Sequence, residues 1–389
     1  MPGVIVNPRA RIYHGHEWVY ASDIRKTFGD PKPGDVVTMK DFKDRPLGSG
    51  IYNPQSQIVV RRISRRAQTL DLDFFKRRLE RALQYRKTLP LDQNAMRLVW
   101  SESDGLPGVI VDRYGDCLVL QTLTLAMDQR KEIIAEALQE MLSPKVIIER
   151  NDSPIRKAEG METVKGVLAG EAPGAFELTI AGLNYEVDLL DGQKTGLYLD
   201  QLENHQLIAR LAKERRVLDV FSHQGGFALT CKQGGAKTVA GIEISESAVE
   251  AAKANAGRND LDIEFITANA FNKLRELGKE TTKYDLVILD PPSFTRNKGA
   301  LKDALRGYKE IHLRALHLLE PGGILGTFSC SHHVGHEVFH DIISSAAVDA
   351  KRTLRRVATY TQRADHPVMA TIPETEYLRG VAYEVIASY

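Results

Sequence analysis

The apolar positions divide the chain into three stretches with different periods. Residues 1 to about 70 contain short runs in which apolar and polar positions alternate, separated by turns rich in Gly, Pro and Asn: EWVYASDI, GDVVTMKD and QIVVRRIS. Such runs between turn residues predict β-strands, so we expect a small β-barrel. Apolar residues at helical spacing follow and predict an amphipathic helix with a basic outer face: Leu72, Phe75, Leu79 and Leu83.

The middle of the chain, to about residue 175, has a mixed pattern. It predicts a helix near 128–142 and four strands: LVW, GVIVDRY, CLVLQTLT and KVIIER. The runs AFELTIA and LNYEVDLL predict a hairpin that turns at Gly182 and leads into the last stretch. We expect a second, small α/β domain here, without a catalytic motif.

From about residue 190, strands and helices alternate regularly. The predicted strands are VLDVFS, TVAGIEI, IEFITAN, YDLVILD and GILGTFSC. The predicted helices occupy 200–213, 226–233, 246–257, 301–319 and 336–348, with a short one after the third strand. This order predicts a doubly wound parallel sheet, which binds ligands at the carboxyl ends of its strands. TLRRVATYT and YLRGVAYEVI have no long helix between them, so we expect an antiparallel edge. The predicted domains are 1–72, 73–175 and 176–389.

The composition narrows the class of protein. The 389 residues are 43% hydrophobic and 26% charged, as in soluble globular proteins. No apolar run is long enough to span a membrane, and MPGVIVNPRARIYHGHEW lacks the apolar core of a secretion signal. The three cysteines, at 117, 231 and 330, cannot form a disulfide framework or a CxxC metal site. We therefore expect a reducing, cytoplasmic compartment and no metal.

The charge is distributed unevenly. Residues 1–100 contain 19 Lys and Arg against 10 Asp and Glu, whereas the rest contains 33 against 41. A basic module in front of an acidic one favours a polyanionic partner, most commonly nucleic acid, although a solvated basic face gives the same count. The candidate contacts follow the last strand of the barrel: Arg61, Arg62, Arg65 and Arg66.

A candidate cofactor site begins where VLDVFS ends in a glycine turn. Asp219 precedes the turn, which contains Gly225 and Gly226 but not the GxGxxG dinucleotide motif. An acid at this place suits the ammonium and sulfonium groups of S-adenosylmethionine (SAM) better than a pyrophosphate. Glu243 ends the next strand, where a carboxylate accepts hydrogen bonds from ribose hydroxyls. Both acids are alternatively ordinary turn residues at strand ends.

Other polar residues surround this candidate site. Asn269 and Ala270 end the third strand and either approach an adenine or, in the case of Asn269, cap the next helix. Upstream, Gln193, Lys194 and Thr195 line the cofactor mouth or help to cap the helix predicted from 200. Asp365, His366 and Pro367 are further candidates for the same pocket.

The fourth and fifth strands end in residues suited to catalysis. Asp290 precedes Pro291, Pro292, Ser293 and Phe294. The prolines hold the carboxylate rigidly, so that a flat nitrogenous base is bound by Asp290 and stacked on Phe294. Cys330 ends the fifth strand in FSCSHH and is a candidate nucleophile, although most cysteines are small buried hydrophobes, as we expect for Cys117 and Cys231. A zinc site at Cys330, His332, His333 and His336 matches no common ligand spacing.

With these motifs in place, the whole chain resembles the RlmI-like family of RNA cytosine-C5 methyltransferases that act on large-subunit ribosomal RNA. The resemblance is carried by GHEWV, LGSGIYNPQSQIVVR, SESDGLPGVIVDRYGD, DGQKTGLYLDQ, LDVFSHQGGFAL, DPPSF, SCSHHV, DHPV and PETEYLRG. It implies an N-terminal PUA domain, a small central α/β domain and a Rossmann-like SAM methyltransferase domain. The residues that it places at SAM or target-base positions are Asp219, Phe221, Gly225, Glu243, Asn269 and Asp290, and Cys330 is the implied nucleophile. The predicted cofactor-binding set also includes Ser222, Gly226, Ile244, Ala270, Gln193 and Thr195.

The resemblance also implies the chemistry. Cys330 adds to C6 of cytosine, C5 takes the methyl group, and Asp290 binds N3 and the exocyclic amine. Many RNA 5-methylcytosine enzymes carry a second cysteine that assists product release, but here Ser293 follows Asp-Pro-Pro. The base that removes the C5 proton is not identified.

Two other functions stay open. A SAM-dependent N-methyltransferase acting on a purine amine also suits a DPP motif but needs no thiol. A non-catalytic RNA-binding or ribosome-assembly protein would keep the cofactor fold without activity. A homodimer also stays open, because the sequence does not determine the oligomeric state.

Overall fold

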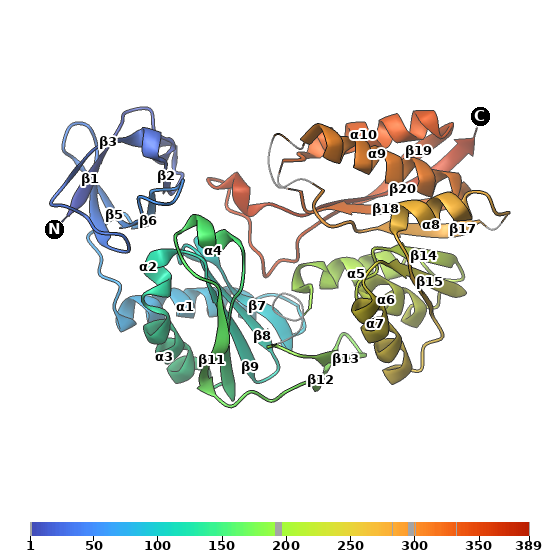
Figure 1. Ribbon diagram of the computed structural model, residues 1–389, viewed down its shortest axis with the longest axis horizontal. Helices are drawn as coiled ribbons and strands as arrows, with labels where there is room; N and C mark the ends of the chain where they lie inside the picture. The colour runs from blue at the N-terminus through green and yellow to red at the C-terminus, as the bar shows by residue number, and fades with distance from the viewer. Residues whose placement is uncertain are drawn as a thin grey trace. The chain divides into compact units, whose positions relative to one another are not determined.

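The computed structural model describes residues 2–190, 197–281, 283–294, 299, 301–331 and 333–388 (Figure 1). The chain forms two compact units. The first contains Met1–Ile180, Val187–Leu199 and Ala364–Glu376, and the second contains Ala181–Glu186, Asp200–Arg363 and Tyr377–Tyr389. In the described parts of the chain, no helix is long and apolar enough to cross a membrane.

The first unit begins with a six-stranded sheet in the order β2-β6-β5-β4-β1-β3. Its strands are β1 (Gly3–Val6), β2 (Trp18–Val19), β3 (Ile24–Phe28), β4 (Val36–Lys40), β5 (Pro46–Tyr52) and β6 (Val60–Ser64). Alternate residues point into the core, where Val4, Val37, Met39 and Val60 are fully buried. The predicted β domain is therefore present.

The helix α1 (Leu72–Lys87) follows this sheet. The Asp71 side chain caps it by accepting a hydrogen bond from the Phe74 amide. Phe75 and Leu79 pack into the core of the central domain, as their spacing predicts. The sheet of that domain has the order β11-β10-β9-β8-β7. Its strands are β7 (Ala95–Trp100), β8 (Val109–Tyr114), β9 (Cys117–Thr122), β10 (Val146–Asn151) and β11 (Val164–Gly170).

Two details of the central domain differ from the expectation. The helix predicted near 128–142 is two helices, α2 (Leu125–Asp128) and α3 (Lys131–Leu142). The strand β11 was not expected, because it contains two glycines and its side chains are mostly exposed. A short helix, α4 (Ile155–Ala158), precedes it, and the predicted hairpin follows it as β12 (Phe176–Ile180) and β13 (Leu183–Val187).

The second unit is built on a seven-stranded sheet in the order β16-β15-β14-β17-β18-β20-β19. The five parallel strands are β14 (Arg216–Val220), β15 (Thr238–Glu243), β16 (Glu264–Thr267), β17 (Tyr284–Leu289) and β18 (Leu319–Ser329). β20 (Arg379–Ser388) pairs antiparallel with both β18 and β19 (Arg352–Thr361). This arrangement confirms the predicted parallel sheet with an antiparallel edge.

Helices cover both faces of this sheet (Figure 1). They are α5 (Leu202–Ala209), α6 (Gly226–Gln233), α7 (Glu246–Arg258), α8 (Ala270–Leu277), α9 (Leu301–His317) and α10 (His336–Asp349). α9 packs against both α8 and α10, and α5 packs against α6. α5 is shorter than the predicted helix 200–213, because Asp200 and Gln201 form a separate turn whose side chains bind elsewhere.

Candidate active site

The site begins at the turn between β14 and α6. Asp219 is fully buried, and its Oδ2 accepts a hydrogen bond of 3.0 Å from the Ala228 amide in the first turn of α6. Within the described chain, Asp219 Oδ1 and Ser222 Oγ are buried without a hydrogen-bond partner. Buried polar atoms are nearly always paired, so these two atoms mark a place where a ligand or water completes the structure.

The backbone of this turn is held in an unusual conformation. Phe221 and His223 have positive φ angles of 68° and 48°, and Gly225 follows with 85°. A Cβ atom at Gly226 would lie 2.4 Å from the His205 ring, so only glycine allows α6 to start this close to α5. Left-handed residues other than glycine are strained and cluster at functional sites. The turn is therefore built to bring backbone close to a ligand.

Glu243 organises the next strand end. Its carboxylate accepts hydrogen bonds from the amides of His223, Ile244 and Ser245, at 3.0, 2.8 and 3.0 Å. It thereby joins the end of β15 to the turn after β14. Asn269, after β16, caps α8 by accepting a hydrogen bond from the Asn272 amide. The structure therefore confirms that Asn269 caps the helix. The predicted approach of Asn269 and Ala270 to an adenine stays a prediction.

The electrostatics of the site favour a cation. The pKa of the Asp219 carboxyl is raised to about 8: burial raises it most, the hydrogen bond from the Ala228 amide opposes the shift, and the charges of Asp290 and Glu243 add to it. Three acidic side chains therefore meet where one buried carboxylate lacks a compensating charge. A ligand that carries positive groups fits this place better than an anionic pyrophosphate.

Asp290 lies directly after β17. Its Oδ2 accepts a hydrogen bond of 3.1 Å from the side-chain amide of Gln201, which is almost fully buried. Gln201 in turn accepts one of 2.6 Å from Asn204 in α5. This chain orients the carboxylate at the carboxyl end of the sheet. Pro291 is buried and Pro292 is exposed, which is consistent with a rigid turn at the rim.

Cys330 directly follows β18, the strand next to β17, and is partly exposed. The Ser293 and Ser331 hydroxyls lie 3.0 Å apart, so a hydrogen bond joins the turn after Asp290 to the turn that contains Cys330. The buried Tyr308 hydroxyl bonds Ser329 and Ser331, at 3.0 and 2.8 Å, on either side of Cys330. Burial raises the pKa of Tyr308, which keeps the phenol neutral. The thiol and the carboxylate therefore belong to one hydrogen-bonded framework.

Phe294 lies in an aromatic cluster. Its ring centroid is 4.7 Å from that of Tyr308, 6.0 Å from Phe271 and 6.4 Å from Phe221. Three neighbouring rings fix its orientation, so it is a firm wall for a flat ligand. Stacking of a base on Phe294 stays a prediction.

The other candidate residues are distributed as follows. Gln193, Lys194, Thr195 and His332 lie outside the described residues. Cys117 and Cys231 are buried, and burial raises the pKa of both thiols, which makes them poor nucleophiles. Asp365 and His366 belong to the first unit, where Asp365 accepts a hydrogen bond from the Arg97 amide. Among the described residues, no three His, Cys, Asp or Glu side chains are arranged to hold a metal ion.

The four predicted RNA-contacting arginines differ in their surroundings. Arg61 forms ion pairs with Glu102 and Glu159, and Arg62 forms one with Glu17. Arg65 and Arg66 are exposed and form no ion pair within the described chain. The last two have whole guanidinium groups available for an external anion, whereas Arg62 has only its Nη2, which has no hydrogen-bond partner among the described residues.

Two residues of the framework were not identified from the sequence. Gln201 is part of the DGQKTGLYLDQ motif, but only the fold shows that it reaches Asp290. Tyr308 lies on the buried face of α9, where its spacing indicates a core residue. The unusual polarity of DGQKTGLYLDQ is a signal that could have identified Gln201. Nothing in the sequence pattern distinguishes Tyr308 from an ordinary core residue.

Comparisons with known proteins bear on the same regions. A family model described as S-adenosylmethionine-dependent methyltransferase matches residues 156–360, and one described as PUA-like domain matches residues 4–65. The chain is 40% identical over 378 residues to "Ribosomal RNA large subunit methyltransferase I" of Erwinia tasmaniensis, covering 95% of this chain and 96% of the relative. The protein of the same name from Tolumonas auensis is 41% identical over 380 residues, with the same coverage.

Solved structures share the fold. SMU.776, a methyltransferase crystallised in complex with SAH, is 22% identical and superposes with a TM-score of 0.86 over 99% of this chain and 100% of its own. A SAM-dependent methyltransferase from Streptococcus mutans is 21% identical, with a TM-score of 0.84 and the same coverage. The complete three-part architecture therefore occurs in other methyltransferases.

Proposed function

Because this chain belongs to the ribosomal RNA large subunit methyltransferase I family and has SAM as its cofactor, we propose that it methylates C5 of a cytosine in large-subunit ribosomal RNA. The observation that carries the choice of atom is the Ser293–Ser331 hydrogen bond. It joins the Asp290 turn to the Cys330 turn, so that a carboxylate for the base edge and a thiol for the ring lie on two connected turns at the ends of neighbouring strands. An amine N-methyltransferase needs no thiol at this place.

The residues around Asp219 suit SAM. The unpaired Asp219 Oδ1 and the nearby acids favour its ammonium and sulfonium groups, and the Glu243 oxygens keep further lone pairs for ribose hydroxyls. When bound, SAM supplies an electrophilic methyl group. The strained turn from Phe221 to Gly225 positions backbone against the cofactor, and Ser222, Gly226, Ile244 and Ala270 complete the proposed binding set.

Cytosine C5 is a weak nucleophile, and the chain supplies groups that activate it. The Cys330 thiolate forms a bond to C6, which moves the ring electrons toward C5, and C5 bonds to the methyl group. A base then takes the C5 proton, the C–S bond breaks, and its electrons return to sulfur. Asp290 in its protonated form gives its proton to N3 as the thiolate adds, which neutralises the charge placed on the ring, and its carboxylate accepts a hydrogen bond from the exocyclic amine. Tyr308 positions the turn that carries Cys330 through Ser329 and Ser331.

The target nucleotide must leave its stack to reach this pocket, which requires the least energy in loops and single strands. The basic residues 1–100, which contain the PUA-like domain, hold the surrounding RNA. All three cysteines are free thiols, which suits a reducing, cytoplasmic setting.

The test is bisulfite sequencing of large-subunit ribosomal RNA after incubation with SAM and either the wild type or Cys330→Ala. We expect one protected cytosine with the wild type and none with the variant, and nucleoside mass spectrometry identifies 5-methylcytosine. Methyl transfer into the same RNA without a protected cytosine would contradict the proposal and favour a purine N-methyltransferase.

A further inference from the structure

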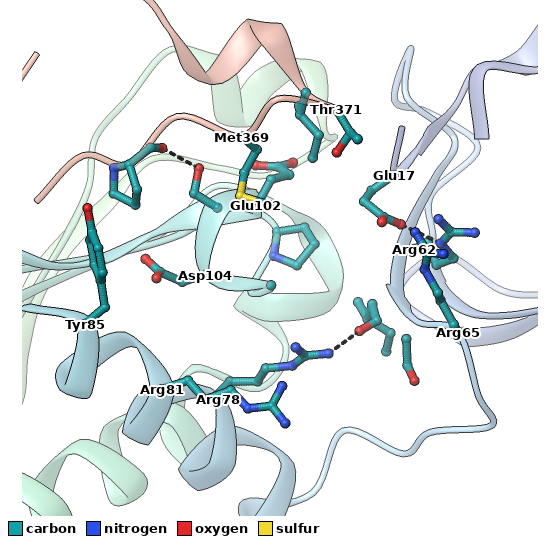
Figure 2. Close-up of a pocket in the computed structure, with 17 residues that line it drawn as sticks. Glu17, Arg62, Arg65, Arg78, Arg81, Tyr85, Glu102, Asp104, Met369 and Thr371 are labelled. Carbon is teal, nitrogen blue, oxygen red and sulfur yellow. Dashed lines mark hydrogen bonds and ion pairs between the residues drawn. The ribbon is translucent and has the colours of Figure 1, made fainter. Parts of the chain in front are cut away.

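A cavity of about 590 Å³ lies within the first unit. Its lining comes from Glu17, the end of β6, the outer face of α1, residues 102–107, and the segment 364–376, which we call the strap (Figure 2). The strap connects β19 to β20 in the sequence but folds with the N-terminal residues.

The strap is firmly anchored to the first unit. The fully buried Arg86 donates to the Asp365 carbonyl at 2.8 Å, and Ser103 donates to the Pro367 carbonyl at 2.7 Å. At the other end, Glu374 pairs with Arg11 at 2.8 Å and with His16 at 3.0 Å. The strap is therefore a fixed wall of the cavity.

The acidic residues of the cavity are already neutralised. Glu17 pairs with Arg62, Glu102 is close to Arg61, and Asp104 pairs with Arg86 at 2.6 Å. These pairs leave no acidic charge in the lining for the other arginines to bind.

Three arginines of the lining keep uncompensated charge. Arg65 and Arg81 are exposed and have no ion-pair partner among the described residues, and Arg78 bonds only the Ile63 carbonyl, at 2.7 Å (Figure 2). Burial lowers the pKa of Arg78, and the charges of Arg81 and Arg77 lower it further. An anion in the cavity would relieve that repulsion.

A buried donor points to the same ligand. The Arg62 side chain is only 6% exposed, yet its Nη2 has no hydrogen-bond partner in the part of the chain that the structure describes. Orphaned charged donors in a protein interior are rare. A phosphate oxygen is the acceptor that a guanidinium fork fits best.

The wall contributed by the strap is less polar. It includes Pro367, Met369 and Ile372, with Pro107 from the central domain. Inorganic phosphate has no apolar surface that could pack against these residues. A nucleotide does, because its base can lie on them while its phosphate binds the arginines.

We propose that this cavity binds one nucleotide of the substrate RNA other than the methylated one, with the phosphates that flank it at Arg62, Arg65, Arg78 and Arg81 and its base against Met369. The proposal rests on the proposed function, since that function makes the substrate an RNA. It gives the strap a role: a segment of the methyltransferase sequence completes an RNA site in the N-terminal unit.

The test compares two double variants of the full chain that remove the same charge from neighbouring positions. R65A/R81A removes two exposed arginines from the cavity. R77A/K87A is the matched control, because Arg77 and Lys87 are exposed, lie on the same helix as Arg81, and are outside the lining. Binding of deproteinised large-subunit ribosomal RNA is measured by filter binding at several salt concentrations, with SAM affinity measured by calorimetry.

We expect R65A/R81A to weaken RNA binding at least tenfold and to reduce the salt slope by about 1.4, or about 0.7 for each lost phosphate contact. The control should change affinity less than threefold, and both variants should bind SAM as the wild type does. If both variants lose RNA affinity equally, the loss reflects general surface charge, and the proposal is wrong. It is also wrong if R65A/R81A binds RNA as tightly as the wild type.

A third variant, Met369→Ala, tests the base contact and should weaken binding without changing the salt slope. An unchanged RNA affinity of Met369→Ala would show that no base packs against Met369. Failure of the proposed function gives a different result from failure of the cavity proposal. In that case the wild type would bind RNA through the cavity but form no 5-methylcytosine.

Discussion

Asp219 is the buried acid at the centre of the methyltransferase unit. It is fully buried, its pKa is raised to about 8, and one of its oxygens has no partner among the described residues. Without a cation nearby, the folded protein therefore holds a proton on this group at neutral pH. A positively charged ligand favours the ionised form, so cofactor binding and proton release are linked.

We expect Asp219→Asn to make the ligand-free protein relatively more stable as the pH rises from about 5 to 8. The unfolded carboxyl ionises near 3.8 and the folded one near 8, so the wild type loses stability over this range. The loss is at most about 1.4 kcal/mol per pH unit. Asn keeps an oxygen for the Ala228 amide but does not ionise.

Thermal unfolding of the two proteins at pH 5 and pH 8 measures this difference. Asp262→Asn, an exposed position before β16, is the control and should follow the wild type. A constant difference between Asp219→Asn and the wild type at both pH values would show that Asp219 is already ionised in the ligand-free protein.

The strap is the element that links distant parts of the sequence. Its anchor, Glu374, is exposed by only 20% and lies between Arg11 and His16. Burial opposes ionisation, but the hydrogen bonds from Arg11 and His16 prevail and lower the pKa of Glu374 to about 2. The charge therefore stabilises the folded strap at neutral pH. Glu374, in the PETEYLRG motif, therefore has a structural role, because it anchors the strap to Arg11 and His16.

Glu374→Gln should loosen the strap. Removing this charge deletes two charge-assisted hydrogen bonds, so we expect backbone amides of the strap to exchange about tenfold faster at pH 7, or about 1.4 kcal/mol of local stability. The wild type should lose this contribution only in acid, as pH falls from about 4.5 through about 2.

Hydrogen exchange read by mass spectrometry checks this prediction. Glu171→Gln changes an exposed acid with no ion pair in the described chain and should leave the exchange of the strap unaltered. If Glu374→Gln also leaves it unaltered, the ion pairs with Arg11 and His16 do not hold the strap.

The elements differ in how well the sequence predicts them. Strands such as β14 and β17 are buried on both faces, so their apolar runs between turns are distinctive, and the predicted helix 226–233 matches α6. β11 lacks such a run because it is exposed and rich in glycine. The strap has no periodic pattern at all, and its contacts with Arg86 and Arg97 span more than 260 residues of sequence.

The candidate site shows the same division. The locations of Asp219, Glu243, Asp290 and Cys330 at the ends of strands were predictable, because an open sheet places strand ends at one edge, whereas their roles stay predictions. Gln201 and Tyr308 act through tertiary contacts, which no local pattern encodes. The arginines were predicted as one group, yet the structure separates the paired Arg61 from the unpaired Arg65.

On the scale of the whole molecule, the proposed RNA-binding and methyl-transfer residues lie in different units. The first contains the basic residues 1–100 and the PUA-like domain, and the second carries the acids and the thiol of the proposed active site. Two chain segments exchange between the units, since the strap belongs to the first and the end of the chain returns to the second. RNA binding and methyl transfer should therefore be separable by mutation in either direction.

The central claim is that Cys330 bonds covalently to a cytosine. The most direct measurement uses ribosomal RNA containing 5-fluorocytidine, because fluorine at C5 cannot leave as a proton and the adduct accumulates. With SAM, we expect the wild type to form an adduct that survives denaturing electrophoresis and whose RNA maps to the peptide containing Cys330 by mass spectrometry; Cys330→Ala should form none. Methylation of cytosine-containing RNA without an adduct on the fluorinated RNA, or an adduct that persists in Cys330→Ala, would contradict this account.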